Sequence, residues 1–211
     1  MTGRLETIFG ELPECRVFAD IGCDHGYIAH AMIKSGKCEK AIISDISEKC
    51  LNKAITLLNE DCAGKFEAVV SDGFEKVRGA DLALIAGMGG EIICNVLTRA
   101  ETLPEKLVLQ PMKNAEKVRL LVINSGYKIL KDYTFKDVKF YDLIVAEKGK
   151  DKGYDERELL YGRDNLKIKS KDFLECVAKK RGELILARDN AADKSELDRK
   201  IAEYSEILDE L

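Results

Sequence analysis

Short apolar runs alternate with amphipathic helical segments through the first 149 residues, and this alternation constrains the fold more than any other feature. Five of the runs are typical of buried strands: residues 16–22, 40–47, 66–75, 80–90 and 105–111. Strands that alternate with helices form a parallel sheet covered on both faces. Two further strand-like segments, 127–137 and 139–149, follow one another directly and predict a closing hairpin. We therefore expect an α/β fold with a mixed, seven-stranded, Rossmann-like sheet.

The pattern changes after Gly149, because residues 150–211 are strongly charged and contain no strand-like run. Near the end, apolar residues recur at the spacing of a heptad seam: Leu197, Ile201, Tyr204, Leu208 and Leu211. An earlier helix, about 170–188, offers the apolar side chains Phe173, Val177, Leu184 and Ile185. Residues 188–193 predict the turn between the two helices, capped by Asp193 or Ser195. We expect residues 1–149 to form one domain and residues 150–211 a coiled-coil-like helical hairpin, although ordinary solvated helices would give nearly the same pattern.

The composition is that of a globular protein with reduced thiols. Seven cysteines are scattered, and none forms a CxxC pair, which disfavours a disulfide framework. The chain shows no signal-peptide pattern and no apolar run of the roughly 20 residues that span a bilayer, so we expect a cytoplasmic protein without a membrane segment. Because His25 and His30 are the only histidines, we expect no metal. The net charge of −4 neither indicates nor excludes a nucleic-acid partner, since local patches decide.

The first predicted strand ends in Asp20-Ile21-Gly22-Cys23-Asp24-His25-Gly26, which is D-x-G-x-x-x-G and not the G-x-G-x-x-G of dinucleotide sites. A pyrophosphate needs the second pattern, whereas S-adenosylmethionine (SAM) carries no phosphate. Gly22 and Gly26 are expected to let the chain pass under the cofactor without a side-chain collision. Asp20 and Asp24 supply acceptors for its ammonium group. Neighbouring residues assigned to the same cofactor pocket are Cys23, His25 and Tyr27.

Acidic residues also end the second and third predicted strands. Asp45 lies 19 residues after Gly26, a spacing that suits a carboxylate accepting both ribose hydroxyls, and Ile46 follows it. NAD sites share this acid, so it indicates a nucleoside site without separating SAM from NAD. The alternative interpretation of Asp45 is an acid in a surface turn. Asp72 is placed to accept the adenine amino group, with Gly73 and Phe74 lining the base. Its alternative is a generic Asp-Gly turn.

Residues 84–91 place three glycines around one methionine after the fourth strand, at Gly87, Met88, Gly89 and Gly90. Either this is a flexible strand–helix turn, or a target base approaches an almost bare backbone edge there. We favour the second interpretation, because three glycines in four residues are entropically costly. Ala86 is assigned to the cofactor pocket. Gln110 and Pro111 follow the fifth strand at the same edge of the sheet, where an amide could pair with a base.

Together these segments resemble the bacterial tRNA adenine-22 N1-methyltransferase family. The resemblance covers about Arg4 to Gly149 and is carried by five stretches: Arg4-Leu5, ADIGCDHGYIA (19–29), DLALIAGMGG (81–90), LVLQP (107–111) and YDLIVAEKG (141–149). It implies a SAM-dependent class I methyltransferase with a helical, coiled-coil C-terminal domain, acting on N1 of an adenine in the tRNA D-loop region. Three positions depart from the family pattern: Ala29 replaces proline, residues 46–50 replace EGP, and Met112 replaces asparagine.

The resemblance also implies a mechanism. Adenine N1 has an in-plane lone pair, so the enzyme's main task is alignment of N1 with the methyl group. The candidates to act near the base are Asp24, the backbone of Gly87, Met88 and Gly89, and Gln110 as its orienting amide. A tRNA partner needs cationic contacts. The candidates are Arg4 near the entrance, Pro111 in the turn after the fifth strand, and Lys167, Lys169, Lys171, Lys179, Lys180 and Arg181 in the C-terminal region. Acids are interleaved among them, so a solvated helix face is the alternative.

Other functions remain open from the sequence. The chain could methylate a protein or a small molecule, or bind SAM without catalysis and use its terminal hairpin for dimerisation. An NAD-dependent oxidoreductase is disfavoured by the D-x-G-x-x-x-G pattern and by the closing hairpin. We expect a monomer or a weak dimer.

Overall fold

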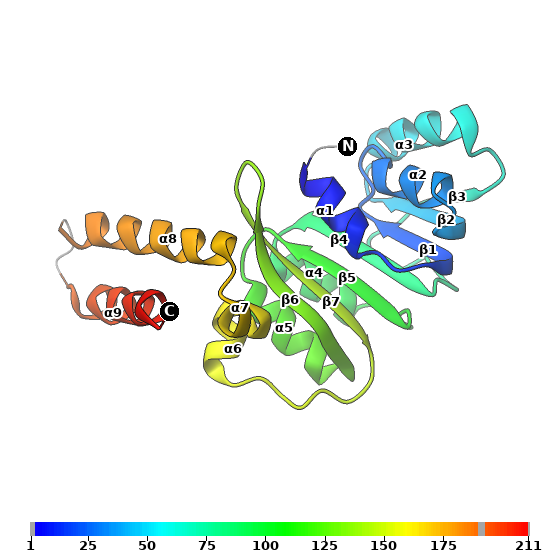
Figure 1. The fold of residues 1–211 in the computed structure, drawn as a ribbon. Coiled ribbons are helices and arrows are strands. Elements are labelled where there is room, and N and C mark those ends of the chain that lie inside the picture. The colour runs from blue at the N-terminus through cyan, green and yellow to red at the C-terminus, as the bar shows by residue number, and fades with distance from the viewer. Residues whose placement is uncertain (1–2, 190–192, 211) are drawn as a thin grey trace.

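A computed structural model of the protein describes residues 3–189 and 193–210. Seven strands form one sheet in the order β3-β2-β1-β4-β5-β7-β6, as Figure 1 shows. The strands are β1 Cys15–Ile21, β2 Cys38–Asp45, β3 Phe66–Val70, β4 Leu82–Met88, β5 Lys106–Pro111, β6 Tyr127–Lys136 and β7 Phe140–Lys148. The pairs formed among β1 to β5 are parallel, whereas β7 runs antiparallel to both β5 and β6. The predicted mixed, seven-stranded sheet is therefore confirmed.

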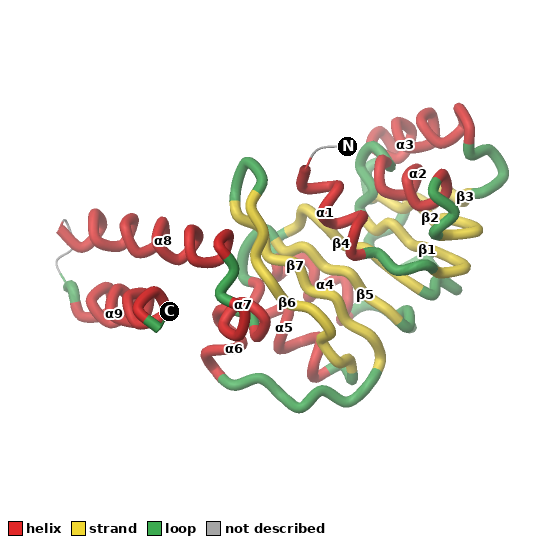
Figure 2. Tube along the Cα trace, viewed as in Figure 1, coloured by secondary structure: helices red, strands yellow, loops and turns green. Residues whose placement is uncertain are grey.

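Helices cover both faces of the sheet (Figure 2). Helices α1 (Gly3–Glu11), α2 (Tyr27–Lys34) and α3 (Glu48–Asp61) pack on one face, and α4 (Gly90–Thr98) and α5 (Ala115–Asn124) on the other. Successive strand side chains point to opposite faces. Accordingly Leu84 of β4 joins the core under α1–α3, while its neighbour Ile85 joins the core under α4 and α5.

One predicted helix cap is confirmed and three are corrected. The N-cap of the last helix, α9 (Ser195–Asp209), is Lys194 and not Asp193 or Ser195. The Ser47 hydroxyl caps α3 by accepting the backbone N–H of Cys50, as expected. Gly36 and Gly126 were expected as C-caps, but the C-caps are the serines that precede them. Each glycine lies one residue later with a positive φ, because that position of the helix-terminating turn favours the left-handed conformation.

A buried ionic network joins the sheet to two short helices that the sequence analysis did not predict, α6 (Glu156–Tyr161) and α7 (Arg163–Ile168). The Arg119 guanidinium on α5 donates through Nε to both carboxylate oxygens of Asp132 on β6, at 2.9 Å each. Both side chains are only 1% exposed. Arg119 also donates to the carbonyl of Leu159 in α6, and the Asn165 amide of α7 accepts the backbone N–H of Thr134. Helices α6 and α7 are thus held by specific polar contacts.

Helices α8 (Lys171–Asp189) and α9 (Ser195–Asp209) lie side by side and project away from the sheet (Figure 1). Their shared core contains Phe173, Val177 and Ile207. The predicted hairpin is confirmed as a pair of packed helices, but Ile185 is exposed instead of lying in the seam. Leu211 and part of the predicted turn, residues 190–192, lie outside the described residues.

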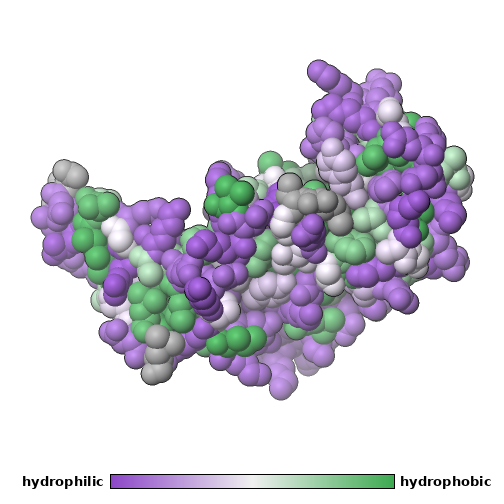
Figure 3. Space-filling model, turned by 45° about the horizontal axis from the view of Figure 1, so that its top comes forward, coloured by the Kyte–Doolittle hydropathy of each residue, from purple (hydrophilic) through white to green (hydrophobic). Residues whose placement is uncertain are grey.

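No helix in the described part of the chain combines the length and apolar character needed to cross a bilayer. Figure 3 shows hydrophilic residues over most of the visible face, with hydrophobic residues in separate patches.

Candidate functional site

The carboxyl ends of neighbouring parallel strands bring the predicted residues to one edge of the sheet. Register places Asp20 of β1 beside Leu84 of β4, and Ala86 of β4 beside Gln110 of β5. On the other side of β1, β2 ends at Asp45. The chain reverses its direction of winding between β1 and β4, because β2 and β3 lie on one side of β1 and β4 on the other. Ligands of open α/β sheets bind at such a switch point.

The loop between β1 and α2 is folded tightly by backbone hydrogen bonds. The backbone N–H groups of Gly22 and Cys23 both donate to the Ser44 carbonyl, at 2.8 and 3.0 Å. Asp24 donates its own N–H to the Asp45 carboxylate at 3.2 Å. Gly22, Asp24 and Gly26 all have positive φ. The loop therefore joins the ends of β1 and β2 into one rigid unit.

The two glycines of this loop are required for different reasons. Gly22 has φ +74°, a conformation that favours glycine, and a Cβ there would also displace the end of the flexible Met88 side chain, 2.1 Å away. A Cβ on Gly26 would lie 2.7 Å from Cβ of Ala54 and 3.0 Å from Leu58, both on α3. The expectation that Gly26 clears space for a ligand is corrected: it permits close packing of α2 against α3.

Asp20 is an acid held in the protein interior, with only 5% of its surface exposed. Burial raises the pKa of its carboxyl to about 7, and the nearby Asp45 charge adds to this, while a hydrogen bond from the Ala29 backbone N–H opposes it. Burial also raises the pKa of the Cys23 thiol, so Cys23 behaves as a neutral thiol at this edge. A cation bound here would draw Asp20 to its ionised form.

Asp24, His25 and Tyr27 form the outer rim of the same loop. His25 Nδ1 lies 2.8 Å from the Asp24 carboxylate, and its ring stacks on Tyr27 with centroids 5.5 Å apart. His25 Nε2 lies 3.4 Å from the Lys53 ammonium of α3. Asp24 and Tyr27 are exposed, which leaves this rim accessible from solvent.

The ends of β2 and β3 confirm some expected positions and correct others. Asp45 accepts the backbone N–H groups of Asp24 and Ser47, and Ile46 beside it is 72% exposed, an apolar side chain open to solvent at the rim. Asp72 forms an ion pair with Arg99 at 2.6 Å, so one carboxylate oxygen is already engaged. Phe74 is only 2% exposed and packs in the core under α4, which rules it out as a lining for a base. A Cβ on Gly73 would lie 2.7 Å from Val96, so Gly73 serves packing.

The glycines after β4 form a ledge, which we define as residues 87–89. Gly87 is exposed, has φ +77° and lies at an irregularity in the β4–β5 pairing. The carbonyl of Met88 accepts the backbone N–H of Met112 at 2.8 Å. A Cβ on Gly90 would lie 2.3 Å from the Asn114 carbonyl oxygen, so only glycine allows the β5–α5 loop to approach. The ledge is therefore fixed in position by the β5–α5 loop.

Gln110 lies beneath the ledge and is fully buried, with 0% of its surface exposed. Its side-chain oxygen accepts the backbone N–H of Gly87 at 3.2 Å and the Arg4 guanidinium at 3.1 Å. Its amide nitrogen donates to the Pro111 carbonyl at 3.0 Å. The expected role of Gln110 as a direct partner of a base is corrected, because its hydrogen-bonding groups are used within the protein. Gln110 is a positioning residue for Gly87.

Arg4 is likewise directed into the protein more than toward a partner. Its backbone N–H donates to Asp137, and its guanidinium lies 5.6 Å above the ring of Tyr141. With its bond to Gln110, Arg4 ties α1 to β5 and to the β6–β7 hairpin.

The predicted cationic residues of the C-terminal region lie in three kinds of surroundings. Arg181 donates to the Ser205 hydroxyl on α9, and Lys169 pairs with Glu210, so both hold the C-terminal helices together. Lys167 is exposed on α7. Lys179 and Lys180 instead line a groove of about 480 Å³ between α8, the β6–β7 hairpin and the β5–α5 loop.

That groove, which we call the basic groove, begins at Met112 beside the ledge. Its cationic lining is completed by two lysines that were not predicted from the sequence, Lys113 and Lys139. Phe140, the first residue of β7, also lines it. Three acids also line it: Glu116, Asp142 and Glu183. Lys113 could have been found from its position directly after the predicted edge residues. Lys139 could not, because only the folded hairpin places it near α8.

Comparisons with known proteins agree with this geometry. A family model described as a methyltransferase domain matches residues 1–144. The tRNA (adenine(22)-N(1))-methyltransferase of Bacillus subtilis is 31% identical over 163 residues, which cover 74% of this chain and 68% of that protein. The crystal structure of the B. subtilis m1A22 tRNA methyltransferase TrmK superposes with a TM-score of 0.82 at 25% identity, over 99% of this chain and 96% of the other.

A putative tRNA (m1A22) methyltransferase of Streptococcus pneumoniae, solved in complex with S-adenosyl-L-methionine, has the same fold. It gives a TM-score of 0.89 at 24% identity and covers 99% of this chain and 100% of the other. The sequence match and the shared architecture lead to one conclusion: this chain belongs to the tRNA (adenine(22)-N(1))-methyltransferase family.

Proposed function

We propose that the protein transfers a methyl group from SAM to N1 of the adenine at position 22 of tRNA. The observation that carries this proposal is the juxtaposition of a rigid, acid-lined loop after β1 with an exposed glycine ledge after β4. The first provides acceptors for a cationic nucleoside, and the second a bare backbone edge for a flat base. Family membership supplies the identity of the base. A tRNA substrate also implies a cytoplasmic enzyme, and a monomer or weak dimer stays a prediction.

The proposed cofactor pocket lies between the ends of β1, β2 and β4. Asp20 and Asp24 would hold the cationic amino-acid end of SAM. Asp45 would accept the ribose hydroxyls, and exposed Ile46 would pack against the adenine. Asp72 remains a candidate for the adenine amino group through the oxygen that Arg99 does not bind. When bound, SAM supplies an electrophilic methyl group.

The ledge aligns the target base in the proposed mechanism. N1 of adenine attacks through its in-plane lone pair, so no proton need be removed before the transfer. The base must leave its stack in the folded RNA, and a bare backbone can accept its flat edge closely. Gly87 is exposed there, and its backbone N–H is held from beneath by the side-chain oxygen of Gln110. Asp24 at the rim offers a carboxylate for the cationic product or for the proton that it loses from N6.

The basic groove is the proposed path of the tRNA backbone, with residues 150–211 as the extension that binds it. The groove runs from Met112 beside the ledge to Lys179 and Lys180 on α8. The larger groove between α6 and α9 is lined by six acids against four bases, which makes it the poorer surface for a polyanion.

The test of the proposed function uses the full chain, unmodified tRNA and SAM labelled in its methyl group. After incubation, the tRNA is digested and the labelled nucleoside and its position are identified. We expect 1-methyladenosine at position 22, and no label in a tRNA whose position 22 is not adenine. Label in protein or small molecules alone would contradict the proposal.

Cofactor binding is expected to strengthen as pH rises through about 7, because the pKa of Asp20 lies at about 7 in the free protein. The cationic groups of SAM favour the ionised carboxylate, so below that pH binding must release a proton. As pH falls below about 7, the dissociation constant for SAM should therefore rise by up to about tenfold per pH unit. Calorimetric titration between about pH 6 and about pH 7.5 measures this slope.

Asp20→Asn provides the control for that titration, because its amide does not ionise and its profile should be flatter. A slope equal to that of the unmodified protein would remove Asp20 from the pocket.

The stability of the free protein should depend on pH with the opposite sign. The pKa of the Asp20 carboxyl is raised from its ordinary value of 3.8 to about 7 in the folded protein. The contribution of Asp20 to the free energy of unfolding is therefore fully present below pH 3.8 and is lost as pH rises toward 7.

Replacing Lys179 and Lys180 together by glutamate is expected to weaken tRNA binding at least about tenfold and leave SAM binding unchanged, because two phosphate contacts become repulsive. The slope of log affinity against log salt concentration should decrease in magnitude by about two. The matched control is Lys49→Glu with Lys65→Glu, two exposed lysines on and after α3 with the same change of charge. Equal weakening by both pairs would show that net charge, not the basic groove, governs binding.

A further inference from the structure

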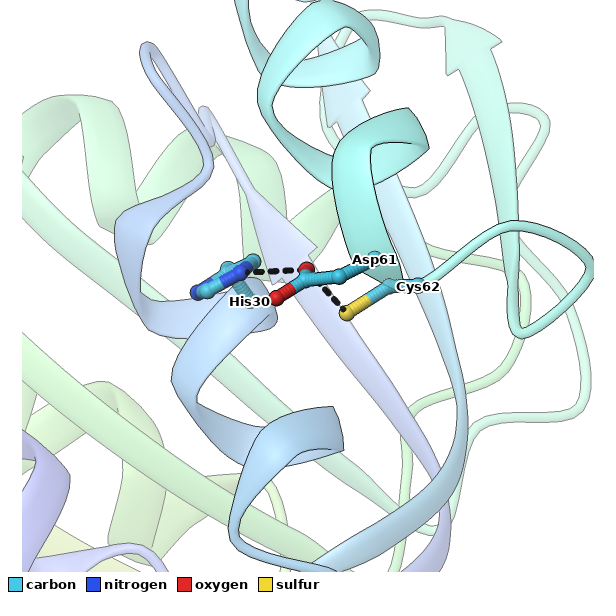
Figure 4. A group of neighbouring side chains, drawn as sticks. All are labelled: His30, Asp61 and Cys62. Carbon is cyan, nitrogen blue, oxygen red and sulfur yellow. Dashed lines mark hydrogen bonds and ion pairs between the residues drawn. The ribbon is translucent and has the colours of Figure 1, made fainter.

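Three side chains able to bind a transition metal meet between α2 and α3, away from the proposed cofactor pocket (Figure 4). His30 projects from α2, Asp61 is the last residue of α3, and Cys62 follows it. Their nearest ligand atoms all lie within 4.8 Å of one another. The expectation of no metal, which rested on the presence of only two histidines in the sequence, did not account for this cluster.

We propose that His30 Nε2, Asp61 Oδ1 and Cys62 Sγ form a Zn²⁺ site, with water as the fourth ligand. The proposal is independent of the methyltransferase function.

Two of the three spacings are close to what a tetrahedral ion requires, and the third, between His30 Nε2 and Cys62 Sγ, is at most 4.8 Å. His30 Nε2 lies 2.8 Å and Cys62 Sγ 3.4 Å from the same oxygen, Asp61 Oδ1. Zinc bonds of about 2.0–2.3 Å in tetrahedral geometry separate neighbouring ligand atoms by about 3.3–3.6 Å. The histidine therefore needs to move by about half an ångström, well within rotamer adjustment of a partly exposed side chain. Cys62 is buried, so its sulfur is already fixed in place.

The donor set selects the metal by its chemistry. One nitrogen, one oxygen and one sulfur suit Zn²⁺, whereas Mg²⁺ and Ca²⁺ require oxygen ligands. The neutral imidazole binds through its lone pair, and the Cys62 thiol must release its proton to solvent as the S–Zn bond forms. Binding should therefore weaken as pH falls.

Lys34 is the feature that opposes a cation here. Its ammonium lies 2.7 Å from the other Asp61 oxygen, Oδ2. It leaves Oδ1 free to face the metal and acts as the outer hydrogen-bond partner that ligating carboxylates usually have. Its positive charge still repels the ion, so Lys34→Gln, which keeps a donor and removes the charge, is expected to bind the metal more tightly.

The consequence of binding would be structural. Asp61 and Cys62 end the helix whose Ala54 and Leu58 pack on Gly26. A metal that joins His30 of α2 to this end of α3 would fasten the two helices that position the β1–α2 loop. We therefore expect a rise in melting temperature on metal binding, and no direct part in methyl transfer.

The experiment titrates the metal-free full chain with Co²⁺ as a spectroscopic probe. A thiolate-to-cobalt charge-transfer band and the strong visible bands of tetrahedral cobalt are expected, and Zn²⁺ should abolish both by displacement. Cys62→Ser and His30→Gln should lose the bands. Cys50→Ser, on the same helix but outside the cluster, should keep them.

Zn²⁺ should also raise the melting temperature of the unmodified chain and of Cys50→Ser, but not of Cys62→Ser. Circular dichroism of each variant without metal shows whether it has folded. Bands that persist in Cys62→Ser would place the metal on another thiol and overturn the proposal. The absence of both bands and stabilisation in the folded, unmodified chain would also overturn it.

Discussion

Replacing Arg119 by leucine is expected to lower the free energy of unfolding by about 3–5 kcal/mol, because the Asp132 carboxylate is left buried without its partner. The two side chains are each 1% exposed and share two hydrogen bonds. The variant also loses the bond from Arg119 to the Leu159 carbonyl. The network therefore fastens α6 and α7 to β6 as well as stabilising the sheet. Urea unfolding followed by circular dichroism measures the loss.

Two further variants separate burial from charge in that experiment. Lys40→Leu breaks an ion pair with Glu67 in which both partners are well exposed, and should cost less than about 1 kcal/mol. The double variant Arg119→Leu with Asp132→Leu removes both buried charges and should recover part of the loss. The interpretation fails if Arg119→Leu costs no more than Lys40→Leu.

The succession of strands and helices along the chain was predictable because each apolar run is short, ends in a turn signal and is followed by a helical period. The pattern at residues 127–149 also revealed the hairpin, since no helix separates its strands. Helices α6 and α7 were missed for the opposite reason. They are short and charged, and their positions depend on the contacts of Arg119 and Asn165 with distant residues.

The positions of the site residues could be predicted better than their roles. Asp20, Gly22, Asp45 and Gly87 lie at one edge because strand ends of a parallel sheet must. Which atoms surround a residue depends on side chains far away in sequence. Gly26 therefore proved to be a packing residue, and Phe74 a core residue.

Gln110→Leu is expected to lower kcat with tRNA by roughly 100-fold and to leave the SAM dissociation constant within about twofold. Leucine has a similar volume but offers no acceptor to the Gly87 N–H or to Arg4, which both bind the same side-chain oxygen. The ledge then loses its support from below, while the β1 and β2 loops are untouched. A shift of about 1 Å in the ledge is enough to misalign the base with the methyl group. Single-turnover assays with labelled SAM, together with calorimetry for SAM binding, measure the two effects.

Gln110→Glu tests whether the acceptor oxygen is what matters. The carboxylate keeps an acceptor for Gly87 and gains an ionic partner in Arg4, so kcat should be reduced much less than in Gln110→Leu. Both variants lose the donation to the Pro111 carbonyl, so that bond cannot explain a difference between them. Circular dichroism and unfolding midpoints confirm that each variant is folded. If Gln110→Leu retains full kcat, the support that Gln110 gives to Gly87 has no part in catalysis, and the ledge must owe its position to the β5–α5 loop alone.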